Sequence, residues 1–204
     1  MKAEFTFVVT IRHDCDDTLL VDRAVSNMAV MIDESPVSQD YGSFEDSKGQ
    51  SHGNATYCGA RRYSLSPTSG YLSHSGTALT LQSSSPGDVG VHSFTLTVDL
   101  VDYPSITPIV KSFTATITCV LTALEYSLTP AASTTIRVGI DAQPHDIPFT
   151  VVQTPICGHA VTYSLDVVDT FTSVDSSNSK LVVDSATIAD HSTKNYVLTA
   201  TSGA

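Results

Sequence analysis

Two stretches of this chain, about one small domain apart, share the same alternating pattern. Residues 113–118 read FTATIT and residues 5–11 read FTFVVTI, and a cysteine follows each of them, at positions 119 and 15. Apolar residues that alternate with other residues are typical of a strand with one buried face. A strand that recurs at this distance indicates an internal repeat, which constrains the fold more than any single motif does.

Three further segments recur in the same order along the chain. They are 58–65 with 157–165, 79–83 with 181–185, and 94–97 with 196–199. The distance between the copies grows slowly from the first pair to the last, which predicts two homologous units that differ by small loop insertions.

The repeat is cut in an unusual place. The first unit closes with the strand at Phe113–Ile117, whereas no such strand follows Tyr196 in the second. The spare copy of the closing strand lies at the N-terminus. We therefore expect three parts: residues 1–14 as a donor or closing strand, 15–118 as a first domain, and 119–204 as a second domain that lacks its own closing strand.

Composition and turn spacing predict an all-β fold. Tryptophan is absent, charged residues make up only 15% of the chain, and no window shows a sustained helical period. Short strand-like runs are separated by Gly, Pro and Ser, as in a β-sandwich. The expected strands are 18–21, 28–32, 61–65, 78–82, 93–98, 112–119, 135–140, 147–153, 161–167, 180–184 and 195–200, and the polar segment 35–55 is expected to be a surface loop.

One motif resembles a known family. In Asp88-Val89-Gly90 an acidic turn residue precedes a glycine, and the aromatic Phe94 then leads a strand, which is similar to immunoglobulin-like and cadherin-like repeats. Asp190 and Tyr196 form a second copy. The resemblance implies two tandem immunoglobulin-like β-sandwich domains of an extracellular protein. The strand cysteine and the tryptophan of antibody domains are missing, and so are the acidic calcium motifs of cadherins, so no calcium site is carried over.

The four cysteines fall two in each unit. Equivalent placement favours the disulfides Cys15–Cys58 and Cys119–Cys157 over the other two connectivities. Four buried, reduced thiols remain the alternative, while the spacing does not suit zinc. Disulfides would indicate an extracellular or cell-surface location.

The charge limits the possible partners. The formal net charge is −11 and the ten basic residues are scattered, which disfavours nucleic acid and anionic membrane surfaces. No apolar run approaches the roughly 20 residues of a membrane-spanning helix.

No catalytic arrangement or cofactor motif is visible, so neither an enzyme nor a cofactor is expected. In His13-Asp14-Cys15 the cysteine is expected to be oxidised, which removes a nucleophile. Asp14, Asp16 and Asp17 carry the oxygen ligands that calcium prefers, although a solvated acidic turn accounts for them as well. Asn54-Ala55-Thr56 is the only N-glycosylation sequon, and we expect a glycan there on an exposed loop.

Function is therefore expected in assembly or binding. The first hypothesis is a structural subunit of an extracellular filament or surface fibre, whose assembly strand completes the second unit of a neighbouring copy or of the preceding stretch of one long tandem chain. The inward residues of that strand would be Phe5, Phe7, Val9 and Ile11. The alternative is an adhesin or receptor ectodomain that binds a partner or glycan through its loops. The aromatic residues that could serve such loops are too scattered to decide: Tyr41, Phe44, Tyr57 and Tyr71.

Overall fold

The computed structural model describes residues 2, 4–128, 134–137, 141, 144–185 and 193–203. It divides into two compact units. Unit 1 consists of Met1–Ser84 with Asp88–Thr118, and unit 2 consists of Ser85–Gly87 with Cys119–Ala204. Nearly all regular structure is β-strand, so the prediction of an all-β fold is confirmed.

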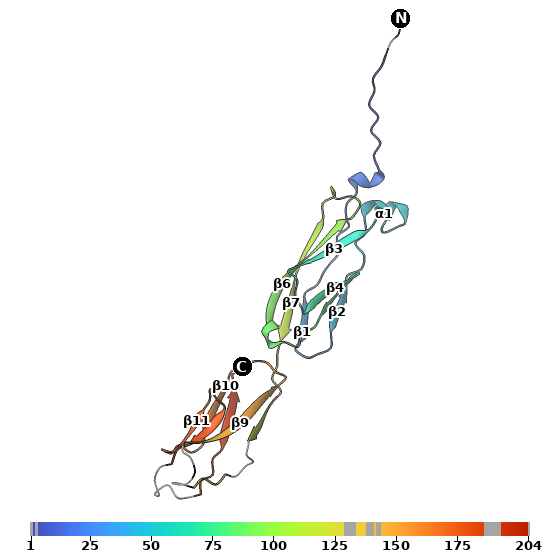
Figure 1. Ribbon diagram of the computed structural model, residues 1–204. Coiled ribbons are helices and arrows are strands. Elements are labelled where there is room, and N and C mark those ends of the chain that lie inside the picture. Colours follow the sequence, from blue (N-terminus) through green and yellow to red (C-terminus); the bar gives the residue numbers. More distant parts are fainter. Residues whose placement is uncertain are drawn as a thin grey trace. The chain divides into compact units, whose positions relative to one another are not determined.

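Unit 1 is a sandwich of two sheets (Figure 1). In spatial order, one sheet contains β1 (Met28–Met31), β7 (Ile109–Thr118), β6 (Gly90–Leu100) and β3 (Arg61–Ser66), and the other contains β2 (Val37–Asp40), β5 (Ala78–Leu81) and β4 (Leu72–Ser75). Among the described strand pairs, only β1 and β7 are parallel. This is the immunoglobulin-like arrangement, in which the third, sixth and seventh main strands face the second, fifth and fourth.

The core of unit 1 follows from the alternation in its long strands. From Phe94 in β6 and from Phe113 in β7 onward every second residue is buried, and the rings of Phe94 and Phe113 stack with their centroids 5.9 Å apart. Leu79 and Leu81 from the opposite sheet are fully buried. Each such side chain contributes roughly 1.5–3 kcal/mol on burial, so the closed sandwich accounts for much of the stability of unit 1.

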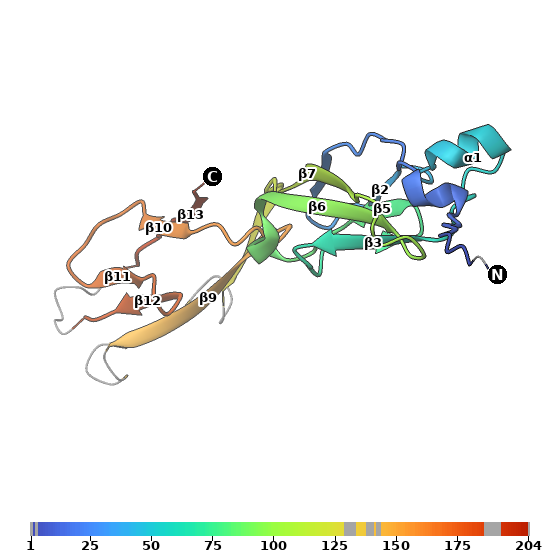
Figure 2. The same cartoon turned by 90° about the horizontal axis from the view of Figure 1, so that it is seen from above.

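The described residues of unit 2 form two sheets with a related strand order. In spatial order, one sheet contains β8 (Ala123–Leu128), β9 (His145–Thr154), β12 (Lys180–Val183) and β11 (Thr172–Asp175). In the other sheet, β10 (Val161–Leu165) pairs with β13 (Leu198–Ser202). Several of these strands are labelled in Figure 2. Tyr63 pairs with Val98 in unit 1, and Tyr163 pairs with Ala200 in unit 2. Strands β10 and β13 thus correspond to β3 and β6, and no strand among the described residues corresponds to β7.

The interpretation of residues 35–55 as a surface loop is wrong. The segment contains β2 and a short helix, α1 (Ser47–His52), and it buries Phe44 and Asp46 completely. Strand β2 was missed because it lies at a sheet edge and carries no alternating apolar residues. The helix was missed because six polar residues show no helical period.

The other expected strands have mixed outcomes. Residues 18–21 form no strand but a single bridge between Leu20 and Asp46. Strands β4, β8 and β11 were not anticipated. The expected strand 135–140 and the second motif residue Asp190 fall largely outside the described residues, and residues 135–137 form no strand.

Candidate functional site

The N-terminal segment presents an unusual row of apolar side chains. Residues 4–13 pair with no strand in the part of the chain that the structure describes, and they extend beyond the short 3-10 helix η1 (Asp14–Asp17) (Figure 1). The four residues expected to face inward are exposed: Phe5 (88%), Phe7 (80%), Val9 (67%) and Ile11 (92%). A continuous exposed apolar segment marks an interaction site.

Unit 2 presents an open sheet edge. In unit 1, β6 lies between β3 and β7 and so is hydrogen-bonded on both sides. Among the described residues, the corresponding β13 pairs with β10 alone. Within the described residues its other edge is therefore available to a further strand, and such an edge is the usual template for strand addition.

The core of unit 2 is incompletely covered. Among its described apolar residues, only Phe149 and Cys157 are buried. Leu198 and Ala200 are half-buried, although their counterparts Leu96 and Val98 in unit 1 are wholly inaccessible. Tyr126 pairs with Val151, two residues beyond Phe149, and thus lies on the inward face, yet it is 77% exposed. The inward face of unit 2 is thus less completely buried at these positions than the matching positions of β6 in unit 1.

Tyr196 occupies the position of Phe94 and is held in place by polar contacts. Its hydroxyl donates to the carboxylate of Asp169 and accepts from Oγ1 of Thr172 at 3.0 Å. Burial and the bond to Asp169 raise the pKa of Tyr196. Burial opposes ionisation of Asp169, but the hydrogen bonds it accepts from Tyr196, Thr172 and Phe171 outweigh this and lower its pKa. The ring is fixed where, in unit 1, Phe94 meets Phe113.

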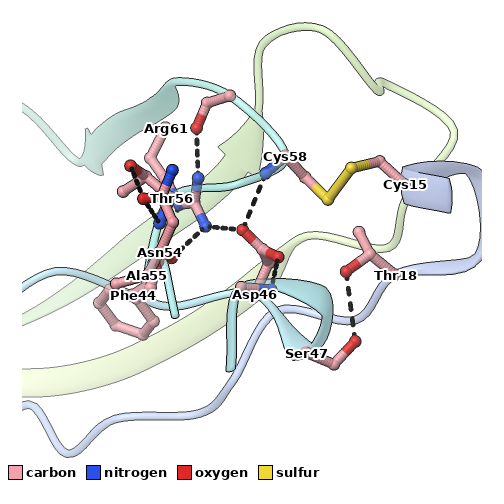
Figure 3. Close-up of polar contacts among 12 residues, drawn as sticks. Cys15, Thr18, Phe44, Asp46, Ser47, Asn54, Ala55, Thr56, Cys58 and Arg61 are labelled. Atoms are coloured by element: carbon pink, nitrogen blue, oxygen red, sulfur yellow. Dashed lines mark hydrogen bonds and ion pairs between the residues drawn. A yellow bond between two sulfur atoms is a disulfide. The ribbon is translucent and has the colours of Figure 1, made fainter. Parts of the chain in front are cut away.

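Both disulfides join the pairs expected from the repeat. Cys15 bonds to Cys58 with Cα atoms 5.5 Å apart, and Cys119 bonds to Cys157 with Cα atoms 5.6 Å apart. Cys15 therefore has no thiol to act as a nucleophile beside His13. Because Cys15 follows the exposed N-terminal segment, its disulfide anchors that segment covalently to unit 1 (Figure 3). The two disulfides indicate an extracellular location.

A buried ion pair supports the same end of unit 1 (Figure 3). Nη2 of Arg61 lies 2.6 Å from Oδ2 of Asp46, and their side chains are 3% and 0% exposed. Asp46 also accepts from the backbone N–H groups of Gly49 and Cys58, and so caps α1 and holds the disulfide loop. Arg61 donates further to the carbonyl oxygens of Phe44 and Ala55. Neither charge is left without a partner.

The Asp46 carboxylate should make unit 1 sensitive to acid. Burial opposes its ionisation, but hydrogen bonds from Arg61 and from two N–H groups outweigh this and hold the pKa of Asp46 below its usual value. A lowered pKa in the folded state gives stability that is present above the ordinary pKa of about 3.9 and is lost as the pH falls through the folded value. We expect Asp46→Asn to lower the stability at pH 7 by about 1.5–3 kcal/mol and to reduce the loss of stability in acid.

Urea unfolding of unit 1 between pH 7 and pH 2 measures this effect. The control is Asp17→Asn, which removes a carboxylate whose side chain is 78% exposed. If the two variants and the parent chain lose stability in parallel on acidification, Asp46 is not the responsible group.

The carboxylates of the acidic turn at Asp14, Asp16 and Asp17 are paired with other groups of the chain. Nζ of Lys48 lies 3.1 Å from carboxylate oxygens of both Asp14 and Asp17, and Nε2 of His52 lies 3.2 Å from Asp14. The bonds from His52 and Lys48 lower the pKa of Asp14. Asp16 accepts from the backbone N–H of His13. No group of three or more metal-ligating side chains occurs in the part of the chain that the structure describes.

The scattered aromatic residues do not form one surface. Tyr41 and Phe44 belong to the core of unit 1, where their exposed fractions are 5% and 0%. Tyr57 is partly exposed and stacks on His52, and Tyr71 packs against Phe94. Within the described residues, no helix is long and apolar enough to cross a membrane.

Comparison with known proteins identifies no family. Neither a family model nor a curated protein matches the chain. Similar solved structures include extracellular domains 3–5 of Drosophila OTK, with 12% identity over 90% of this chain and 63% of that one and a TM-score of 0.36. Extracellular cadherin domains 1–5 of protocadherin gamma B2 match with 12% identity over 84% of this chain and 33% of that one, and a TM-score of 0.41. A SusE-like surface polysaccharide-binding protein from Bacteroides thetaiotaomicron is also similar, with 10% identity over 81% of this chain and 28% of that one and a TM-score of 0.37. The chain spans less than two thirds of each, and its fold assignment rests on the strand pairing described above.

Proposed function

We propose that this protein is a non-enzymatic structural unit of an extracellular filament or tandem fibre, assembled by strand complementation. Residues Phe5–Ile11 of one copy add beside the stretch that leads into β13 of another copy, or of the unit that precedes them in a longer chain, and take the place that β7 holds in unit 1. The observation that carries the proposal is the contrast between the units. Unit 1 has a seventh strand and a closed core, whereas the described residues of unit 2 lack that strand and leave the corresponding residues only partly buried.

Unit 1 provides the template for the register. There β7 runs antiparallel to β6 with Phe113 opposite Phe94. Aligning residues 7–11 (FVVTI) with 113–117 (FTATI) places Phe7 opposite Tyr196 and Phe5 opposite Leu198. Phe7 then packs on the tyrosine ring that Asp169 and Thr172 hold in place.

The energetics favour the added strand. Burial of the four exposed apolar side chains contributes about 6–12 kcal/mol before the costs of ordering and association are subtracted. At Phe5, which lies opposite Leu198, the added strand also begins to pair with the open edge of β13. Because donor segment and acceptor edge are different surfaces, the contact is heterologous, and it propagates when the operation that relates copies does not close a ring.

A self-complemented variant tests the proposal. Residues 4–12 are removed from the N-terminus and attached after residue 204 through an eight-residue Gly/Ser linker, the length of the connection between β6, which ends at Leu100, and β7, which begins at Ile109. We expect this variant to be monomeric, with unit 2 more stable to urea than in the unassembled parent chain. Sedimentation and urea unfolding measure the two effects.

A matched control carries the same transplanted segment with Phe5 and Phe7 replaced by Ser. It should neither assemble nor gain stability in unit 2. If the parent chain is itself monodisperse at all concentrations, or if the transplanted segment leaves the stability of unit 2 unchanged, the chain is not a strand-complemented subunit and a loop-binding ectodomain becomes the better description.

A further inference from the structure

Unit 1 contains an insertion that its repeat does not require. In unit 2, β9 ends at Thr154 and Cys157 follows almost at once. In unit 1, Asp46 bridges to Leu20 much as Thr154 pairs with Ala123, but residues 47–57 intervene before Cys58. This insertion forms α1 and the loop that carries Asn54-Ala55-Thr56. Since unit 2 forms its strand pairs without it, the insertion is not required for the sheets that the two units share.

Hydrogen bonds to Gly49 and Arg61 fix the backbone of the inserted loop. The N–H of Asn54 donates to the carbonyl of Gly49 at 3.0 Å, and the carbonyl of Ala55 accepts from Arg61 at 3.0 Å (Figure 3). A Cβ atom at Gly49 would lie 2.3 Å from the Asn54 carbonyl oxygen, so this close approach requires glycine. The disulfide at Cys58 fixes the far end of the loop.

The side chains of the sequon are presented outward. Asn54 and Thr56 are both exposed, and Oδ1 of Asn54 accepts from the backbone N–H of Thr56 at 3.2 Å and from its Oγ1 at 3.3 Å. This arrangement leaves Nδ2 of Asn54 without a hydrogen bond to any described residue. The space beside the loop is open, since a Cβ atom at Gly53 would meet nothing within 4 Å.

From these observations we propose that Asn54 carries an N-linked oligosaccharide, and that the insertion of residues 47–57 holds this residue at the surface of unit 1. The donor is an oligosaccharide on a polyprenyl diphosphate. Nδ2 attacks the anomeric carbon, an N–C bond forms, the C–O bond to the diphosphate breaks with its electron pair on that oxygen, and one amide proton is released. The bulky, hydrated product then lies at the end of unit 1 where the assembly strand is anchored through Cys15.

The test uses the full chain secreted from a eukaryotic host. We expect its intact mass to exceed that of the polypeptide by an oligosaccharide, and an amidase that removes N-glycans to convert Asn54 alone to Asp. Asn54→Gln and Thr56→Ala should both abolish the added mass, whereas Thr56→Ser, which keeps the hydroxyl, should retain it.

Thermal unfolding of the same variants separates modification from folding. Asn54→Gln should unfold at nearly the same temperature as the enzymatically deglycosylated chain. A secreted, folded parent chain without an oligosaccharide on Asn54, or a glycan that persists in Thr56→Ala, would overturn the proposal. Strand assembly is scored on the same samples, so failure here is distinguishable from failure of the proposed function.

Discussion

Phe7→Asp is expected to abolish assembly while unit 1 stays folded. In the proposed register residue 7 packs on the Tyr196 ring in an apolar groove, and a carboxylate brought there without a partner costs several kcal/mol. Each 1.4 kcal/mol is tenfold in affinity, so association should weaken by at least about a thousandfold. Analytical ultracentrifugation should show only single chains, and the near-UV spectrum and urea midpoint of unit 1 should match those of the parent.

The matched control for this prediction is Val8→Asp. Val8 is as exposed as Phe7 in the free chain, at 89% against 80%, but alternation turns it to the outer face of the added strand. It should assemble almost normally. Normal polymers of Phe7→Asp, or equal loss of assembly in both variants, would show that the segment does not add as a strand with a buried face.

The strand pattern made much of the fold predictable. Period-two alternation located β6 and β7 because both have one face in the core, and the repeat transferred the same reasoning to β10 and β13. The repeat also predicted the two disulfides, because cysteines at equivalent positions of the two units are expected to form equivalent bonds. Edge strands such as β2 escaped because their residues face solvent on both sides and lack the alternation.

The supporting polar structure was not predictable from spacing. Nothing in the sequence distinguishes Arg61 from Arg62, yet the first is buried against Asp46 and the second pairs at the surface with Asp99. Burial of Arg61 depends on carbonyl groups that the chain brings together only after folding. The hydrogen bond from Tyr196 to Asp169 could not be predicted from the sequence either, because the two residues lie 27 positions apart.

Of the candidate site, the donor segment was predictable from the sequence, whereas the surface that accepts it was not. The donor segment repeats a strand that the chain also uses internally, so its inward residues could be named from the sequence. The half-exposed faces of Leu198 and Ala200, and the inward position of Tyr126, required the sheet register. The pairing of the segment with β13 remains a prediction.

The two disulfides should differ in what their loss does. Chain-entropy reasoning gives each about 4 kcal/mol of stabilisation, because they close loops of similar length. In unit 1 a closed core remains after Cys15→Ala/Cys58→Ala, so this variant should stay folded with a lower urea midpoint. In unit 2 the core is open, and Cys119→Ala/Cys157→Ala should leave it largely unfolded in the unassembled chain.

The assembly strand should reverse only the second of these losses. A synthetic peptide of residues 4–12, added in excess to the Phe7→Asp background so that no chain complements another, supplies the missing strand to unit 2 and stabilises it by mass action. We expect the peptide to restore the urea transition of unit 2 in Cys119→Ala/Cys157→Ala and to leave that of Cys15→Ala/Cys58→Ala unchanged. A peptide carrying Asp at position 7 is the negative control. Equal rescue of both units, or rescue by the control peptide, would show that the segment binds apolar surface without completing the sandwich of unit 2.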